Sequence, residues 1–260
     1  MQLTKEWITG FVDGDGCFSI HLEEGKYLRH RFIVSQNVKS VDVLYALKKT
    51  FGCGTVHKAG GNMMEFVIEN RLHLRDKVIP HFCKFPLQTT KKRLDFHKFV
   101  SSLGEHMIKK EEEPGSPIMP SNDGYDLSAG WFRGFVDAEG SFVCSIVENR
   151  PIPQFILGLS HVERSLLEEC QRWLNCGTCR FPAEDSFCFQ IADTQQLEMF
   201  LFPLLETRGS AVLLRTIKRI SFQKLRKIVR SMLKGHHKTS EGLEKIRKLQ
   251  KDLQKNNKFL

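Results

Sequence analysis

The apolar positions of the chain change their period several times, and they do so in the same order twice. Residues 4–16 carry apolar side chains at helical spacing and end at a glycine. Residues 17–22 alternate as a half-buried strand does, and residues 32–35 follow as the returning strand. Residues 41–51 resume helical spacing, and residues 53–55 open a second hairpin before the closing helices. The pattern predicts the order α-β-β-α-β-β-α.

The same order returns after a shift of 124 residues, and one short motif marks it. Residues 7–16 read WITGFVDGDG and residues 131–140 read WFRGFVDAEG, so both share W-x-x-G-F-V-D-(G/A)-(D/E)-G. Thr4 and Ser128 precede the two motifs at equivalent places, where either could cap a helix. Repetition at the spacing of a domain indicates a duplicated unit. We therefore expect an α+β fold of two pseudo-symmetric αββαββα units.

The repeat and the composition predict four segments. The first unit covers residues 1–110, a linker residues 111–126, the second unit residues 127–235, and a basic C-terminal helical tail residues 236–260. The linker is polar and rich in Pro, Gly and Ser, without an apolar period. The tail has leucine and isoleucine at helical spacing. Two roles for it stay open: it adds phosphate contacts, or it packs on the body of the protein.

Net charge is +9, and its distribution is uneven. Residues 1–110 carry 18 Lys/Arg and 11 Asp/Glu, residues 111–214 carry 6 and 16, and residues 215–260 carry 15 and 3. Basic character therefore lies in the first copy and the tail, which suits a polyanionic partner. The second copy is acidic, so we expect the first copy to supply most phosphate contacts.

Several classes of protein are disfavoured by the sequence. No apolar run approaches the length of a membrane span, and the N-terminus lacks the regions of a signal peptide, so we expect no membrane partner. The eight scattered cysteines indicate a reduced, intracellular setting, either an organelle (chloroplast or mitochondrion) or a bacterial cytoplasm. Cys176 and Cys179 form a C-x-x-C without a second cysteine or histidine pair, which favours a structural role over zinc.

Small residues recur inside the motif at a spacing of one helical turn. Gly10 and Gly14 form the pair in the first copy, and Gly134 and Ala138 repeat it. Glycine costs up to about 1 kcal/mol inside a helix, so the pair needs a reason. Small residues four apart let two helix backbones approach closely. We expect the two motif helices to pack on each other.

Each motif also ends in an acid, Asp15 in the first copy and Glu139 in the second. Packed helices would bring these carboxylates together at two helix C-termini, where both the like charges and the helix dipoles are unfavourable. A divalent cation offsets this repulsion, and oxygen ligands favour Mg²⁺ or Ca²⁺. Such a site can activate a water and stabilise a leaving oxygen in phosphodiester hydrolysis.

With both motifs in place, the chain resembles single-chain, two-motif LAGLIDADG homing endonucleases over residues 4–225. The resemblance implies two curved antiparallel sheets that form a DNA-binding saddle, with the motif helices packed at the centre. It implies that Asp15 and Glu139 bind the catalytic metal, with Gly14 and Ala138 in the metal site. The implied cofactor is Mg²⁺, with Mn²⁺ or Ca²⁺ as substitutes in binding. The implied reaction cuts both strands and leaves short 3′ overhangs.

Other residues are matched between the copies or placed by the resemblance. Asp13 and Asp137 lie one turn before the motif ends, and we interpret them as structural. Gln36, at the end of the returning strand, fits the place where the family often has a polar residue near the metal. The second copy has Leu159 there, which predicts a lopsided site.

The family also often places a basic residue on its late helix, near the metals. Lys91 and Arg208 each lie five residues past the proline of a Phe-Pro-Leu sequence, and they form the best candidate pair. A cation there could steady the phosphate or tune a water. Lys92 and Arg93 are close rivals.

Base-reading residues should alternate along the strands, on a face that the sequence leaves ambiguous. Arg and Gln suit bidentate contacts to bases. The candidates are His21, Arg29, Arg31 and Lys58 in the first copy, and Arg150, Gln154, Arg180 and Gln190 in the second.

The sequence thus predicts a monomeric, Mg²⁺-dependent, site-specific endonuclease of double-stranded DNA that is associated with an intron or an intein. Because no splicing domain surrounds it in this sequence, a free-standing or intron-encoded form is favoured. Because the two sheets differ, its target should be long and only partly palindromic. Two alternatives remain: an intron RNA maturase, with intron RNA as its partner, and a non-catalytic DNA-binding regulator. Retention of both acids argues against either as the sole function.

Overall fold

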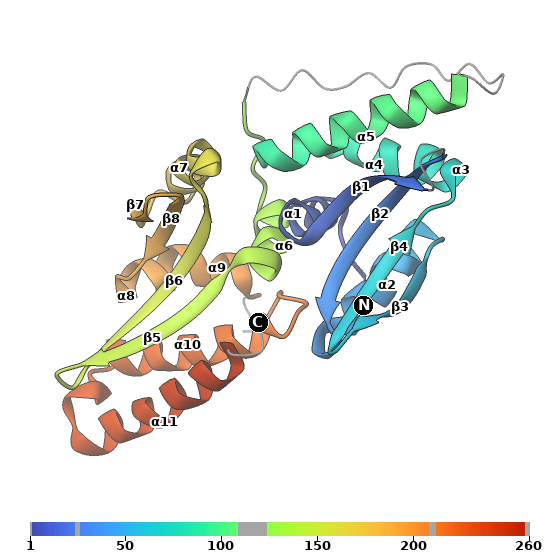
Figure 1. Ribbon diagram of the computed structural model, residues 1–260. Coiled ribbons are helices and arrows are strands. Elements are labelled where there is room, and N and C mark those ends of the chain that lie inside the picture. Colours follow the sequence, from blue (N-terminus) through green and yellow to red (C-terminus); the bar gives the residue numbers. More distant parts are fainter. Residues whose placement is uncertain (1, 24–26, 109–123, 208–211, 258–260) are drawn as a thin grey trace. The chain divides into compact units, whose positions relative to one another are not determined.

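The computed structural model describes residues 2–23, 27–108, 124–207 and 212–257. The chain forms two compact units, residues 1–138 and residues 139–260 (Figure 1). The boundary falls inside helix α6 (Ala129–Glu139), which begins the second sequence copy but packs with the first unit except for its last residue. Most of the predicted linker lies outside the described residues, so its character stays a prediction.

The first unit follows the predicted order, with short helical turns added. Its elements are α1 (Lys5–Asp15), β1 (Gly16–Glu23), β2 (Tyr27–Asn37), η1 (Val38–Ser40), α2 (Val41–Phe51), β3 (Thr55–Gly60), β4 (Met63–Ile68), α3 (Arg71–His73), the π-helical turn η2 (Leu74–Val78), α4 (Ile79–Lys84) and α5 (Thr90–Ile108).

The second unit repeats this order after α6 and adds one helix. Its elements are β5 (Ser141–Val147), β6 (Arg150–Ser160), η3 (His161–Glu163), α7 (Arg164–Leu174), β7 (Thr178–Ala183), β8 (Ser186–Ile191), α8 (Thr194–Gln196), the π-helical turn η4 (Leu197–Leu201), α9 (Phe202–Leu205), α10 (Lys218–Leu233), η5 (His236–Lys238) and α11 (Ser240–Asn257).

Each unit is built on one four-stranded antiparallel sheet. The strand orders are β1-β2-β4-β3 and β5-β6-β8-β7, which are the same order in two copies. Equivalent residues also share register: Phe32 lies opposite Ile68, and Phe155 lies opposite Ile191. The expected α+β fold of two αββαββα units is confirmed.

The motif helices begin where the sequence predicts. The Thr4 hydroxyl accepts a hydrogen bond from the Trp7 amide, and the Ser128 hydroxyl accepts one from the Trp131 amide. Each satisfies one of the amide groups that a helix start leaves without a partner inside the helix. The helices end at Asp15 and Glu139, directly before Gly16, the first residue of β1, and Gly140, which precedes β5.

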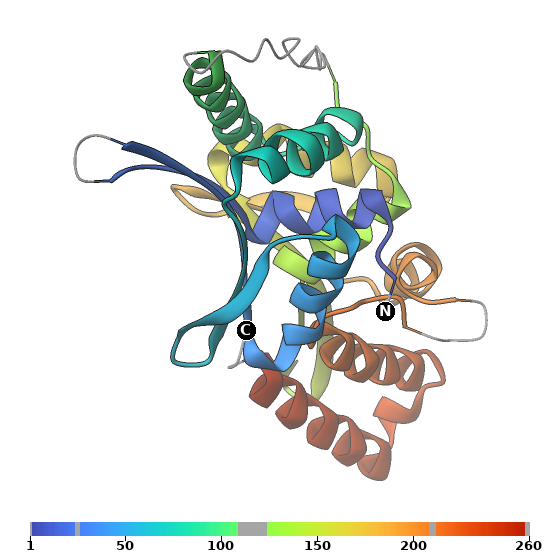
Figure 2. The same ribbon diagram turned by 90° about the vertical axis from the view of Figure 1, so that its right-hand side faces the viewer.

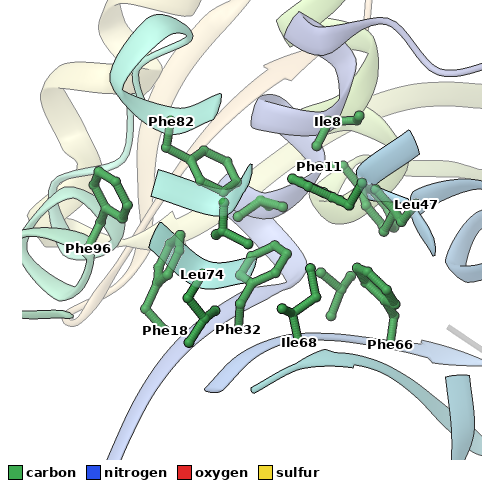
Figure 3. Close-up of a cluster of buried hydrophobic side chains, with 14 of the residues drawn as sticks. Ile8, Phe11, Phe18, Phe32, Leu47, Phe66, Ile68, Leu74, Phe82 and Phe96 are labelled. Carbon is green, nitrogen blue, oxygen red and sulfur yellow. The ribbon is translucent and has the colours of Figure 1, made fainter. Parts of the chain in front are cut away.

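The core of the first unit lies between its sheet and its helices, and phenylalanine dominates it (Figure 3). Phe18 of β1 contacts the rings of Phe32, Phe82, Phe96 and Phe99, with ring centroids 5.0–5.5 Å apart. Helix α5 therefore lies over the same sheet face as α4. The opposite face carries the polar side chains of the strands.

In the second unit the tail forms part of the core. Helix α11 packs along α10 and against β5, and Figure 2 shows the two helices side by side. Ile246 and Leu253 of α11 are fully buried. Arg247 donates a hydrogen bond of 2.5 Å to the side-chain oxygen of Asn149, in the turn between β5 and β6. Of the two roles that the sequence left open for the tail, packing on the body is the one that these contacts show, and a role in phosphate binding stays a prediction.

Ion pairs hold α10 against the segment that follows α9. The Glu206 carboxylate is nearly buried and receives the guanidinium groups of Arg226 and Arg230. Arg230 also pairs with Glu198 at 2.9 Å. Because Arg226 and Glu206 are largely removed from water, breaking this pair should cost more than breaking an exposed pair.

Candidate functional site

Helices α1 and α6 touch through their backbones at one glycine of each motif. A Cβ atom added to Gly10 would lie 1.9 Å from the carbonyl oxygen of Trp131, and one added to Gly134 would lie 2.0 Å from that of Trp7. Side chains cannot occupy such distances, so only glycine permits this approach. The predicted packing of the motif helices is confirmed at Gly10 and Gly134.

The two helices are also joined by a reciprocal pair of buried hydrogen bonds. The indole N–H of Trp7 donates to Oδ2 of Asp137 at 3.0 Å, and the indole N–H of Trp131 donates to Oδ2 of Asp13 at 2.7 Å. All four side chains are at most 4 % exposed. Each motif therefore supplies one donor and one acceptor to the other.

Asp13 additionally fixes the chain that leads into α5. Its carboxylate accepts hydrogen bonds from the amides of Gln88 and Thr89 at 2.9–3.1 Å and from the Thr89 hydroxyl at 2.9 Å. Complete burial nevertheless raises the pKa of Asp13 from 3.8 to about 6, against the lowering effect of these donors. The structural interpretation of Asp13 and Asp137 agrees with these contacts.

Asp15 lies at the end of α1 and is half-buried, and a residue of strand β2 holds its side chain. The side-chain amide of Gln36 donates a hydrogen bond of 2.6 Å to Oδ2 of Asp15. Gln36 is the residue that the sequence placed beside this acid. Glu139 ends α6 in the equivalent position and is also half-buried. The two acids belong to different compact units, so their sharing of one metal site stays a prediction.

The basic pair is the part of the site where the sequence prediction needs correction. Each π-helical turn is followed by a short helix with proline at its second residue, and these prolines are Pro80 in α4 and Pro203 in α9. Pro203 therefore corresponds to Pro80 rather than to Pro86, which follows α4. Arg208, counted from Pro203, is consequently not the equivalent of Lys91, and it lies outside the described residues.

The equivalent basic residues are Lys92 and Lys218, near the starts of α5 and α10. The sequences TKKRLDF, residues 90–96, and TIKRISF, residues 216–222, share Thr-x-Lys-Arg and a phenylalanine that packs on the first strand of its sheet. The Lys92 ammonium donates to the carbonyl oxygen of Gly16, directly after Asp15. Lys218 is only 8 % exposed. Lys91 is exposed.

The strand registers decide which candidate DNA-binding residues share a face. Arg150, Gln154 and Gln190 lie on the face of their sheet opposite the helices, since their neighbours in sequence include the buried residues of the strands. Arg180 lies on the same face, because it pairs with Cys188, two residues before Gln190 on β8. In the first unit, His21, Arg29 and Arg31 lie on the corresponding face, and His21 pairs directly with Arg29.

Lys58 is the exception among these candidates. It pairs with Met64 on β4. Phe66, two residues further along the same face of β4, is buried in the core, so Lys58 lies on the face that the helices cover. The sequence left the face of this strand ambiguous. Burial alone does not decide it either, because nearly every residue of β3 is exposed, and the register with β4 is needed. His57, on the opposite face, is 3.8 Å from the Glu65 carboxylate.

The arginines of the first sheet are arranged around acids. Arg29 contacts Glu23 at 3.0 Å and Glu69 at 3.1 Å, and Arg31 lies 3.6 Å from the same Glu69 carboxylate. In the second sheet the buried Oε1 atom of Gln190 has no hydrogen-bond partner among the described residues. A polar atom left in that state costs free energy unless a ligand or water satisfies it.

Metal-binding potential can be judged from the donor atoms. Among the described residues, no group of three or more His, Cys, Asp or Glu side chains is arranged to hold a metal ion. Burial raises the pKa values of Cys176 and Cys179 to about 11, which disfavours the thiolate that zinc requires. One carboxylate at a helix end fits Mg²⁺, which takes one or two carboxylates and completes its shell with water and phosphate oxygens.

A family model described as LAGLIDADG endonuclease matches residues 8–103 and 132–229 of the chain. The chain belongs to this family. Both matched segments contain a motif helix, a sheet and the lysine-bearing helix, so the family relation covers both copies. Within the part of the chain that the structure describes, no helix is long and apolar enough to cross a lipid bilayer.

Relatives and solved structures give the same result. A probable intron-encoded endonuclease, Cox1-I1b of Schizosaccharomyces pombe, is 33% identical over 159 residues, which are 53% of this chain and 40% of the relative. A probable intron-encoded DNA endonuclease of Mycosarcoma maydis is 24% identical over 252 residues, covering 78% of this chain and 92% of the relative. The chain thus spans only about two fifths of the length of the first relative.

Two solved structures share the fold across the whole chain. I-SmaMI, bound to an uncleaved DNA target in the presence of calcium ions, has a TM-score of 0.84 at 21% identity and covers 96% of this chain and 98% of its own. The LAGLIDADG homing endonuclease I-GzeII, in complex with its DNA target, has a TM-score of 0.84 at 19% identity, covering 96% and 97%.

Proposed function

We propose that the protein is an intron-encoded homing endonuclease that cuts both strands of a long, partly asymmetric DNA target. The observation that carries this proposal is the retention, in a chain of this family, of a carboxylate at the end of both motif helices. Asp15 and Glu139 occupy these places, and Gln36 and Lys92 surround the first of them. The protein acts as a monomer, because one chain carries both copies.

The reaction that suits these groups is hydrolysis of a phosphodiester. A water oxygen forms a bond to phosphorus, the bond from phosphorus to the leaving sugar oxygen breaks, and the protons of water pass to the solvent and to the leaving oxygen. Bound Mg²⁺ would supply Lewis acidity and a more acidic water. Asp15 and Glu139 would hold the cation, with the backbone of Gly14 and Ala138 beside them.

Residues near the acids have separate tasks. Gln36 holds the Asp15 carboxylate in one orientation. The ammonium groups of Lys92 and Lys218 would stabilise the negative charge that develops on the phosphate. Arginine and glutamine on the sheet faces opposite the helices would contact bases in the major groove. These candidates are His21, Arg29 and Arg31 in the first unit and Arg150, Gln154, Arg180 and Gln190 in the second.

The first experiment is a cleavage selection on randomised duplex DNA in Mg²⁺. The wild type should enrich one family of sites, and Asp15→Asn and Glu139→Gln should leave the enriched site intact while still binding it in Ca²⁺. A related enzyme is bound to uncleaved DNA in calcium, which makes Ca²⁺ the suitable ion for the binding arm. Failure of the wild type to cut any sequence, or undiminished cutting by both variants, would reject the proposal.

A second experiment tests the basic residues against a matched neighbour. Lys92→Met should lower the cleavage rate constant by about 100-fold, as loss of a charge-stabilising donor does, with little effect on DNA affinity. Lys91→Met removes the same charge one residue earlier, and it should change the rate less than about threefold. Equal losses from the two variants would contradict the assignment of Lys92.

The comparisons give no support to the alternative of an RNA maturase. The relatives and structures named above are endonucleases or probable endonucleases, and both structures contain DNA. Organellar origin remains a proposal that follows from the intron-encoded relatives.

A further inference from the structure

We propose that Glu69 is a positioning residue for base recognition, because it holds Arg29 and Arg31 in place on the strand face opposite the helices. The inference rests on the proposed function, in which this face meets DNA. Glu69 directly follows β4, and its Oε2 atom lies 3.1 Å from Nη2 of Arg29 and 3.6 Å from Nε of Arg31. One carboxylate oxygen therefore attracts two guanidinium groups.

Strand register explains why these three side chains meet. The antiparallel pairing of β2 with β4 ends at Ile68, and its continuation by one residue places Glu69 opposite Arg31. Arg29 stands two residues away on the same strand face, a diagonal distance that long side chains span. Strand β1 completes the cluster, because Glu23 contacts Nη1 of Arg29 at 3.0 Å. Arg29 is therefore held between two acids that come from different strands.

The cluster orders the two arginines before DNA arrives. Binding a base costs an arginine much of its rotamer freedom, and a partner that already restricts the side chain lowers this cost. A guanidinium has five N–H donors, so contact with a carboxylate leaves others for the O6 and N7 acceptors of guanine. Nε of Arg31 is buried without a hydrogen-bond partner among the described residues, and the charge of Glu69 offsets part of the cost of that burial.

The cluster also limits binding that does not depend on sequence. Its two arginines and two glutamates have a formal net charge of zero, so it attracts phosphates little, and phosphate attraction is the same for every sequence. Half-exposed ion pairs of this kind contribute little to folding stability. We therefore expect the effect of Glu69 in base preference and not in the fold.

The corresponding positions of the second sheet carry other residues. The shift of 123 residues that relates β2 to β6 places Ile152 and Gln154 where the first sheet has its arginines. The same shift relates β4 to β8 and places Ala192 where the first sheet has Glu69. Positioning of arginines by a shared carboxylate is thus a property of the first sheet at these positions.

The test compares base preference with affinity for unrelated DNA. Glu69→Gln keeps the length of the side chain and removes its charge. Fluorescence anisotropy in Ca²⁺ gives the affinity for the site that the wild type cleaves and for each single-base variant of it. The ratio of affinities for correct and incorrect bases should fall by about fivefold at the base pairs where Arg31→Ala lowers it. Affinity for unrelated DNA should rise, because a negative charge has left the binding face.

Two further variants separate charge from positioning. Glu65→Gln removes the same charge from the same strand face, where the carboxylate accepts a hydrogen bond from Ser35 and lies 3.8 Å from His57. It should raise affinity for unrelated DNA by a similar factor and leave base preference at the arginine positions unchanged. Glu69→Asp keeps the charge and shortens the side chain, so it should lose base preference without a rise in affinity for unrelated DNA.

Removal of both arginines separates positioning from a direct contact of Glu69 with DNA. In a protein with Arg29→Ala and Arg31→Ala, Glu69→Gln should change base preference no further. Unchanged base preference in Glu69→Gln, an equal loss from Glu65→Gln, or a further loss in the protein without the two arginines would each overturn the proposal. Thermal unfolding checks that each variant folds, and if Glu69→Gln does not, Glu69→Asp decides. A wild type that cleaves no site would instead reject the endonuclease function.

Discussion

The two copies of the repeat keep one backbone and surround their acids differently. In the first, Asp15 is held by Gln36, and the Lys92 ammonium binds the adjacent carbonyl. In the second, the place of Gln36 is taken by Leu159. The two copies therefore keep the helix and strand positions around each acid, while the side chain that the strand places there has changed.

The copies also differ in how they complete their cores. The first unit finishes with α5, whereas the second adds α11, which covers α10 and reaches β5. The added helix itself carries 5 Lys/Arg and 3 Asp/Glu, whereas α10 carries 6 Lys/Arg and no acid, so α10 is the more basic of the two helices. The tail is therefore part of the folded unit, and any phosphate contacts it makes come from a rigid surface rather than from a mobile arm.

The largest expected effect concerns Gly10 and Gly134, the glycines at which the two motif helices touch. Gly10→Ala should destabilise the protein by about 3 kcal/mol or more, because the new methyl group meets backbone that cannot move aside. Gly134→Ala should cost a similar amount. Gly104→Ala, in α5 with open space around it, should instead stabilise by about 0.5–1 kcal/mol. Chemical denaturation measures all three, and equal effects at Gly10 and Gly104 would refute the close contact.

The second prediction concerns the helix that only the second copy has. Ile246→Ala empties a fully buried position between α11 and its neighbours, and it should cost about 3 kcal/mol. Lys248→Ala, on the exposed side of the same helix, should cost less than about 0.5 kcal/mol. Hydrogen exchange should show the loss of protection in β5 and not in β1. Unchanged protection of β5 would mean that α11 does not stabilise the sheet.

The third prediction uses pH to test the buried hydrogen bonds between tryptophan and aspartate that join the two motif helices. Because the folded pKa of Asp13 is about 6 and its ordinary value is 3.8, its contribution to stability is present below about pH 4 and is lost as pH rises through 6. The stability of the wild type relative to Asp13→Asn should thus fall by roughly 3 kcal/mol between pH 4 and pH 7.

Trp131→Phe removes a donor that lowers this pKa, so it should move the loss to higher pH. Denaturation curves for the three proteins at several pH values provide the measurement. A difference between wild type and Asp13→Asn that does not vary with pH would contradict the raised pKa.

The smallest expected effects compare the two faces of the first sheet. Arg31→Ala should relax the preference for particular bases by about 1–2 kcal/mol, since its strand face is the one opposite the helices. Lys58→Ala, on the other face, should weaken binding to all sequences slightly and equally. Competition between target variants in Ca²⁺ gives both values. A larger loss of sequence preference from Lys58→Ala would reverse the assignment of faces.

The local features of the fold could be predicted because short-range rules decide them. Helix starts at Thr4 and Ser128, helix ends before glycines and the contact at Gly10 all follow from residue type and spacing. Gln36 could be placed through the family resemblance, because it lies at the end of the returning strand, which the alternating pattern locates. The motif helices correspond by a shift of 124 residues and strands β2 and β6 by a shift of 123, so the two copies differ here by one residue only.

The basic residues could not be placed in this way, because the connection between α9 and α10 is longer than that between α4 and α5. Spacing counted from a proline therefore selects Arg208, while the helix register selects Lys218. Two prolines also compete, since both Pro80 and Pro86 can be read as the counterpart of Pro203. Only the position of proline within a helix start distinguishes them. The repeated Thr-x-Lys-Arg sequence was the signal that could have found the pair.

The crossed bonds between tryptophan and aspartate have a consequence for building new proteins from this one. Each motif carries one donor, Trp7 or Trp131, and one acceptor, Asp13 or Asp137. Suppose that one sequence copy is replaced by a copy from another chain that has the same tryptophan and aspartate positions. The new copy then supplies both the indole donor and the carboxylate acceptor that the remaining copy requires. A half that lacks either would leave a buried polar group without its counterpart. Compatibility of exchanged halves can therefore be screened at two positions per half before any DNA contact is redesigned.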